Sequence, residues 1–169
     1  MDSEKRKSRS IKFQKPGLDD ANQIYNLVKR SQPLDINSLY SYLLVCAHFN
    51  RTSIVTKYDN QVVGYVSAYI KPQRDDTLFI WQVAVAPSMR GQGLASKMIH
   101  QILQRRELQE IKYIETTVTP SNQASMNLFK KISQDLNCDI KKSSYFTRDL
   151  FGESSHEEEL LLCIGPLKK

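Results

Sequence analysis

Apolar residues alternate with polar ones in some parts of the chain and recur every three or four positions in others. Alternation that is rich in Val, Ile and Tyr predicts β-strands, and the longer period predicts amphipathic helices. The turn residues Asp59 and Asn60 separate two of these strands and indicate a hairpin. Strands are expected at residues 11–13, 53–57, 61–70, 77–85, 111–118 and 159–164, and helices at about 20–32, 37–48, 94–106 and 122–132.

The order of these elements predicts one α/β domain. Residues 140–155 are polar and irregular in pattern, and one more strand is expected near Tyr145. Strands run directly into helices after residues 85 and 118, so parallel and antiparallel pairs are expected in the same sheet. We expect a single domain over residues 11–167, preceded by a flexible basic tail over residues 1–10.

The composition is that of a globular protein, with 40% hydrophobic and 25% charged residues among 169. No apolar run approaches the 18 or so residues of a membrane-spanning helix, so no membrane partner is expected. Cys46, Cys138 and Cys163 are widely spaced and odd in number. This favours free thiols in a reducing compartment, the cytoplasm, over a disulfide scaffold or a zinc site.

The formal charge of +6 lies at the two ends of the chain. Residues 1–15 hold six basic and two acidic residues, and Lys168 and Lys169 add two positive charges. The body of the domain is neutral. Because a nucleic-acid site needs a basic groove or stripe, no nucleic-acid partner is expected.

A glycine-containing turn between a strand and a helix carries the first chemical signal. Val85 ends the strand, and Arg90, Gly91, Gln92 and Gly93 precede the helix. Glycines allow backbone N–H groups to face outward, and the start of a helix attracts anions, so the turn could bind phosphate oxygens. It is not a Walker loop, because no Lys-Ser/Thr pair follows. The alternative interpretation is a purely structural turn.

In this context the turn resembles the pyrophosphate-binding loop of the GNAT superfamily of N-acetyltransferases, whose pattern is Gln/Arg-x-x-Gly-x-Gly/Ala. Arg90, Gly93 and Ala95 match that pattern. The resemblance implies a central mixed, mostly antiparallel sheet flanked by helices, and acetyl-CoA as cosubstrate, with its thioester where the fourth and fifth strands separate. The coenzyme-binding residues that it implies are Val83, Val85, Arg90, Gly91, Gln92, Gly93, Leu94, Ala95, Asn122 and Phe129.

Phe129 departs from the superfamily's pattern. Many members have a tyrosine at this position, seven residues after the asparagine, where its hydroxyl can protonate the leaving thiolate. The general acid therefore stays open between Tyr40, Tyr145 and a water molecule, or no dedicated acid is needed.

Four stretches resemble one family in particular, the L-2,4-diaminobutyrate acetyltransferases of ectoine biosynthesis. They are residues 34–44, 79–85, 115–125 and 156–159, and the resemblance extends from about residue 11 to Pro166. It implies acetylation of the γ-amine of L-2,4-diaminobutyrate, a reaction of the osmotic stress response, by a cytoplasmic homodimer.

The residues can be compared with that substrate, which carries two ammonium groups and one carboxylate. Asp35 is either a helix N-cap or a ligand, and Trp81 is either a core residue or a platform for the substrate. His156 is a surface residue or a ligand of the carboxylate, and the glutamates beside it are a frayed strand end or part of the site. The predicted substrate-binding residues are Asp35, Tyr40, Trp81, Glu115, Thr117, His156, Glu158 and Glu159.

The expected mechanism is direct transfer, because no Ser or Cys stands in the setting of a nucleophile. Glu115 and then Asp35 are the candidate bases that deprotonate the amine, with Tyr40 as a further catalytic candidate, and backbone N–H groups near Val83 polarise the thioester. No metal site is expected. Two other functions stay open: acetylation of another small amine, a polyamine or a protein N-terminus, and a CoA-binding regulatory module without turnover.

Overall fold

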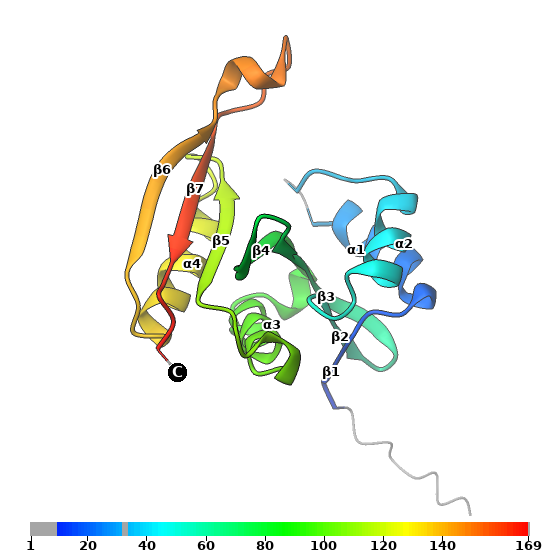
Figure 1. Cartoon of the computed structure of the whole chain (residues 1–169). Helices are drawn as coiled ribbons and strands as arrows, with labels where there is room; N and C mark the ends of the chain where they lie inside the picture. Colours follow the sequence, from blue (N-terminus) through cyan, green and yellow to red (C-terminus); the bar gives the residue numbers. More distant parts are fainter. Residues whose placement is uncertain (1–9, 32–33, 169) are drawn as a thin grey trace, which may run out of the picture.

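The computed structural model describes residues 10–31 and 34–168. The predicted tail, apart from Ser10, lies outside the described residues, and so does Pro33. Figure 1 shows the arrangement. The strands are β1 (Lys12–Gln14), β2 (Ile54–Tyr58), β3 (Gln61–Lys71), β4 (Arg74–Val85), β5 (Tyr113–Val118), β6 (Ile140–Phe146) and β7 (Glu159–Ile164). The α-helices are α1 (Ala21–Lys29), α2 (Leu39–His48), α3 (Leu94–Leu103) and α4 (Gln123–Asp135), with short 3-10 turns at Leu18–Asp20, Pro87–Met89, Arg106–Leu108 and Arg148–Phe151.

The described strands form one seven-stranded sheet in the order β1-β2-β3-β4-β5-β7-β6. Among them, β4 and β5 are the only parallel neighbours, which confirms the mixed, mostly antiparallel sheet. The β4–β5 ladder is short, since its last pair is Phe79 with Glu115, although β4 continues to Val85 and β5 to Val118. The two strands are therefore unpaired with each other over their second halves.

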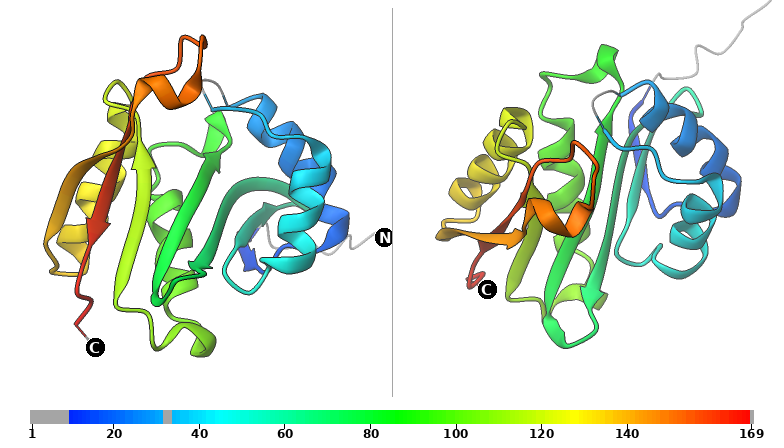
Figure 2. Two further views of the ribbon diagram at one scale, coloured as in Figure 1. Left: turned by 45° about the horizontal axis from the view of Figure 1, so that its top comes forward. Right: turned by 90° about the horizontal axis from the view of Figure 1, so that it is seen from above.

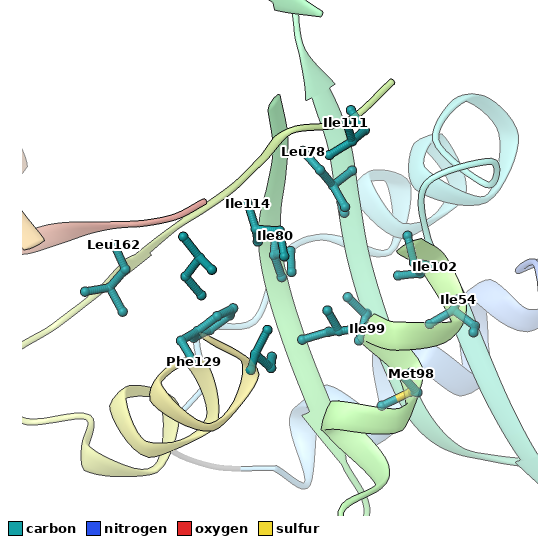
Figure 3. Packing of buried hydrophobic residues seen from close by; sticks show 14 of the residues in the cluster. Ile54, Leu78, Ile80, Met98, Ile99, Ile102, Ile111, Ile114, Phe129 and Leu162 are labelled. Carbon is teal, nitrogen blue, oxygen red and sulfur yellow. The ribbon is translucent and has the colours of Figure 1, made fainter. Parts of the chain in front are cut away.

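Helices cover the two faces of the sheet unequally. α3 and α4 pack on one face, where Ile80, Met98, Ile114 and Phe129 belong to the larger buried cluster (Figure 3). α1 and α2 pack on the opposite face over β2 and β3, around the fully buried Tyr65 (Figure 2). The β5–β7–β6 part of that second face has no described helix on it. Helix α1 carries Ile24, Leu27 and Val28 inward at the spacing that the sequence predicts.

A β-bulge interrupts the alternation of β4. Ser67 pairs with Gln82 and Ala68 with Ile80, so Trp81 is the additional residue on β4. Ile80 points into the α3–α4 core, whereas Gln82 contacts Tyr42 of α2 on the opposite face. Trp81 is 48% exposed, so the interpretation of this residue as a core side chain is wrong.

The structure also defines where β6 and α2 begin, which the sequence predicted only approximately. β6 spans Ile140–Phe146, which confirms the additional strand near Tyr145. Every residue of β6 is exposed, so no inward-facing alternation marks it in the sequence. Helix α2 begins at Leu39, and Ser38 is its N-cap, with its side-chain oxygen accepting a hydrogen bond from Ser41 N at 3.2 Å. Asp35 is therefore not the N-cap.

Candidate active site

The turn between β4 and α3 has the geometry of an anion site. Gly91 and Gly93 have φ angles of 75° and 71°, the left-handed region that favours glycine. A Cβ added at either position would meet nothing within 4 Å, so the backbone faces open space. No described side chain caps the start of α3, and the first-turn N–H groups are left for an external acceptor. These features fit the phosphates of a nucleotide-type coenzyme.

The remaining coenzyme candidates contribute in different ways. Arg90 is exposed, and its Nε donates to Val85 O at 3.2 Å. The side chains of Val83 and Val85 pack against the α3–α4 core, so any polar contact of these residues would come from the backbone. Gln92 is exposed, Ala95 is partly buried and Leu94 is buried in the core.

Asn122 and Phe129 have structural roles in helix α4. Asn122 is the N-cap, and its Oδ1 accepts a hydrogen bond from Ser125 N at 3.0 Å. Phe129 is 2% exposed and lies in the core (Figure 3). Contact of either side chain with the coenzyme stays a prediction.

A second cluster forms where the β6–β7 connection meets the segment between α1 and α2. His156 Nε2 lies 3.5 Å from Asp35 Oδ2 and 3.8 Å from Glu159 Oε1. The ring of Phe151 stacks on the imidazole with 4.1 Å between centroids. Figure 2 shows the orange 148–156 connection reaching the same end of the sheet as the blue α1–α2 segment. Residues about 120 positions apart in the sequence are thereby brought together.

The pKa values of His156 and Glu159 in this cluster are both raised. The backbone carbonyl of Glu157, 2.6 Å from His156 Nδ1, raises the pKa of the imidazole, and the carboxylates of Glu159 and Asp35 add to that effect. Burial raises the pKa of Glu159, although a hydrogen bond with Thr117 and the charge of His156 oppose the shift. The cluster therefore favours a protonated imidazole beside a carboxyl with increased proton affinity.

Trp81 and Thr117 connect this cluster with the separated strands. The last β4–β5 pair is Phe79 with Glu115, so both residues lie two positions beyond it on their strands. Because side chains repeat every two residues, Thr117 shares a face with Glu115. Thr117 contacts Glu159, and the exposed indole of Trp81 stands on the other strand. Asp35, Thr117, His156 and Glu159 thus form one cluster, and Trp81 stands on β4 at the level where β4 and β5 separate.

Glu115 occupies a different environment. Its side chain is 3% exposed, and both of its oxygens are engaged: Oε2 lies 2.6 Å from Lys71 Nζ, and Oε1 lies 3.2 Å from Arg74 Nη1. The hydrogen bond with Glu115 raises the pKa of Lys71. Both oxygens of the Glu115 carboxylate therefore already accept hydrogen bonds from cationic side chains. Its role as a base stays a prediction, and this pairing weighs against it.

Comparison with known proteins identifies the family. The model of the acetyltransferase (GNAT) family matches residues 21–133. The L-2,4-diaminobutyric acid acetyltransferase of Marinococcus halophilus is 45% identical over 160 residues, which cover 95% of this chain and 92% of that protein. The chain belongs to the GNAT acetyltransferases, in the group of the diaminobutyrate acetyltransferases. It is therefore an N-acetyltransferase that uses acetyl-CoA.

Solved structures agree with this family assignment. The diaminobutyrate acetyltransferase EctA of Paenibacillus lautus, in complex with its substrate L-2,4-diaminobutyric acid and coenzyme A, superposes with a TM-score of 0.91. It is 32% identical, and the match covers 96% of this chain and 98% of that one. Ard1 from Thermoplasma volcanium, at 15% identity and a TM-score of 0.72, shares the fold.

Three other predicted residues of the acetyltransferase lie at the margin of the site. Tyr40, in the first turn of α2, is 68% exposed. Glu158 accepts a 3.4 Å hydrogen bond from Ser144 of β6, and Tyr145 has its ring centroid 6.0 Å from Lys71 Nζ. Among the described residues, no group of three or more His, Cys, Asp or Glu side chains could hold a metal ion. No helix in the described ranges is long and apolar enough to cross a membrane.

Sequence reasoning missed the side chains that support the acetyltransferase site. Gln82 is a polar residue within an apolar stretch of β4, and that pattern could have marked it as paired or functional. Lys71 and Arg74 lie in the polar hairpin over residues 71–76, where charged residues are common and give no such signal. The partners of all three lie more than 40 positions away in the sequence, so the pairing itself had no local signal.

Proposed function

We propose that this acetyltransferase transfers the acetyl group of acetyl-CoA to the γ-amine of L-2,4-diaminobutyrate, the reaction of ectoine biosynthesis that yields N4-acetyl-L-2,4-diaminobutyrate. The observation that carries the proposal is the cluster of Asp35, His156 and Glu159 at the end of the sheet where β5 separates from β4, the strand that carries Trp81. It offers two carboxylates and one imidazole to a ligand with two ammonium groups and one carboxylate.

Each end of the substrate has a complementary group. The carboxylates of Asp35 and Glu159 attract ammonium groups, and the imidazolium of His156 attracts the α-carboxylate. The exposed indole of Trp81 can lie against the methylene groups and one ammonium. Tyr40, Thr117 and Glu158 complete the proposed substrate-binding set at its edge.

The γ-ammonium must lose a proton before it can attack, because the reference pKa of an alkylammonium is about 10. Glu159 is the carboxylate best suited to accept that proton, since burial raises its pKa. Asp35 is the next candidate, and its side chain is 86% exposed. Glu115 is a weaker candidate than either, because Lys71 and Arg74 hold both of its oxygens.

Acetyl-CoA supplies the acetyl thioester when it is bound. The turn at Gly91–Gly93 and the start of α3 would hold its pyrophosphate, with Arg90 close by, and Asn122 would lie along the coenzyme arm. Backbone N–H groups of β4 near Val83 would orient the carbonyl, since this part of β4 has no ladder with β5. Phe129 has no hydroxyl to donate, so Tyr40, Tyr145 or water would protonate the thiolate, if it is protonated at all.

We also propose that the enzyme works as a homodimer in the cytoplasm, without nucleic-acid or membrane partners. The family resemblance supports the dimer, and the described cysteines, which are all free thiols, support a reducing compartment. Light scattering on the purified full chain tests the dimer, and a single-chain mass would contradict it.

Mass spectrometry and NMR on reactions with acetyl-CoA test the substrate. We expect kcat/KM to be highest for L-2,4-diaminobutyrate and the acetyl group to lie on the γ-nitrogen, because adding or removing a methylene displaces the distal amine by more than about 1 Å. Similar kcat/KM values for 2,3-diaminopropionate, ornithine and putrescine would refute the diaminobutyrate assignment and indicate a general amine acetyltransferase. Binding of acetyl-CoA without acetyl transfer to any amine would indicate a CoA-binding regulatory module.

A further inference from the structure

A buried glutamine connects the strand that carries Trp81 with the segment that carries Asp35. Gln82 is 9% exposed and follows Trp81 in the bulge of β4. Its Nε2 donates to the backbone carbonyl of Asp35 at 2.8 Å, and its Oε1 accepts from the hydroxyl of Tyr42 at 3.2 Å. Both ends of one side-chain amide are therefore engaged, each with a partner on a different element.

The hydroxyl of Tyr42 extends this connection. It accepts a hydrogen bond from Asn37 N at 3.3 Å while it donates to Gln82. Tyr42 is 2% exposed, and its ring makes edge contacts with Tyr25 and Tyr65 in the α1–α2 core. The position of the Tyr42 hydroxyl is therefore fixed by packing. Its hydrogen bonds in turn orient the side-chain amide of Gln82 and the backbone N–H of Asn37.

The segment between α1 and α2 depends on these contacts. Residues 35–38 have no regular secondary structure, and the Asp35 side chain is 86% exposed. The carboxylate of Asp35 faces His156, while its backbone carbonyl is held by Gln82. Without the amide, the carbonyl of Asp35 would lose its buried donor, and the segment would lose a direct connection to β4.

We propose that Gln82 is a positioning residue for the diamino-acid site: its buried amide holds the backbone of Asp35 beside Trp81, so that the carboxylate of Asp35 meets the substrate at a fixed distance from the reacting amine. The inference rests on the proposed substrate-binding role of Asp35. A displacement of about 1 Å in a positioned group can reduce the rate on the order of 100-fold. The role needs a donor and an acceptor on one uncharged side chain, which the amide supplies.

Gln82→Met tests the proposal, because methionine has nearly the same length and neither donates to Asp35 nor accepts strongly from Tyr42. We expect kcat/KM for diaminobutyrate to fall at least about 10-fold through a higher KM. The dissociation constant for acetyl-CoA should stay within about twofold, since the phosphate turn is not touched. Gln23→Met is the matched control: its Oε1 accepts from Val62 N at 2.9 Å, so it removes a comparable hydrogen bond of α1 that does not involve residues 34–38. It should leave both constants unchanged.

Gln82→Glu adds a readout that lost stability alone does not produce. A protonated carboxyl can accept from Tyr42 and donate to Asp35, whereas the ionised form cannot donate. The ratio of its kcat/KM to that of the wild type should therefore rise as the pH falls through the pKa of the new carboxyl, while the ratio for Gln82→Met stays flat. If Gln82→Met does not fold, Tyr42→Phe, which keeps the ring in the core, should raise the KM for diaminobutyrate several-fold.

Three outcomes would overturn the inference. The first is a kcat/KM for diaminobutyrate within twofold of the wild type in Gln82→Met or, where that variant does not fold, an unchanged KM in Tyr42→Phe. The second is an equal loss of affinity for acetyl-CoA, and the third is a ratio of kcat/KM between Gln82→Glu and the wild type that does not change with pH. A wild-type enzyme that does not acetylate diaminobutyrate would instead contradict the proposed function, and the same variants would then be assayed with whichever amine the wild type accepts.

Discussion

Replacing Glu115 by glutamine removes the negative charge that Lys71 and Arg74 share. Breaking a fully buried ion pair costs about 3–5 kcal/mol. The cations here have side chains that are 22% and 44% exposed, so water reduces the cost, and we expect about 2–3 kcal/mol for Glu115→Gln. For a chain of 169 residues, this corresponds to a fall in Tm of roughly 4–12 °C.

The same variant separates a supporting role of Glu115 from a catalytic one. If Glu115 supports the sheet, kcat at a temperature where the variant is folded should fall less than about 10-fold. Removal of the base should cost about 100-fold or more, and we expect that loss for Glu159→Gln. The assay is steady-state kinetics with acetyl-CoA and diaminobutyrate, together with calorimetric Tm values.

A paired control makes the test sharper. In the double variant Glu115→Gln with Lys71→Gln, Tm should lie close to that of the single Glu115 variant, because the partner charge is already lost. A 100-fold loss of kcat in Glu115→Gln with an unchanged Tm would refute this reasoning and make Glu115 the base.

Three further predictions concern the two ligand sites and pH. Gly93→Val should weaken acetyl-CoA binding at least about 10-fold in calorimetric titration, because φ at this position is 71° and the new side chain covers the exposed backbone. An unchanged affinity would refute the assignment of this turn to coenzyme binding. Trp81→Ala and Asp35→Ala should each raise the KM for diaminobutyrate and leave acetyl-CoA affinity near its wild-type value; equal losses would indicate general damage. Hydrogen bonding to the Glu157 carbonyl raises the pKa of His156 in the folded state above its unfolded value. The difference in Tm between the wild type and His156→Gln should therefore be fully present below about pH 6.5 and disappear as the pH rises through the folded pKa of His156. A difference in Tm that grows with pH would contradict this expectation.

The fold was largely predictable because its elements carry strong local patterns. The helical spacing of Ile24, Leu27 and Val28 and the turn at Asp59 and Asn60 each depend on neighbouring residues alone. β6 was seen only in part, because an exposed edge strand buries nothing and so shows no alternation. The N-cap at Ser38 was missed for a different reason: several residues before α2 have side chains that can cap a helix, and the sequence does not show which of them does.

The sequence indicates candidate site residues one by one, but it does not indicate how they are arranged. The bulge at Trp81 exposes a side chain that strand alternation in an apolar segment would place in the core, and it depends on the register with β3. The ion pairs of Glu115 join residues 41 and 44 positions apart. Such contacts come from the order of strands in the sheet, and nothing in the local pattern specifies them.

The two proposed ligand sites differ in the sign of the charge that they would attract, and the sheet explains how one small domain can hold both. In the proposed coenzyme site, phosphates are attracted by the open N–H groups at the start of α3 and by Arg90, which follow the carboxyl end of β4. In the proposed site, ammonium groups are attracted by Asp35, which lies in the segment between α1 and α2, and by Glu159, which begins β7. Because β4 carries both Trp81 and Val85, the strand sets the distance between the two sites. In the proposed reaction the amine and the thioester meet where β4 and β5 are unpaired, which is why the short ladder between these strands is as important to that reaction as any single side chain.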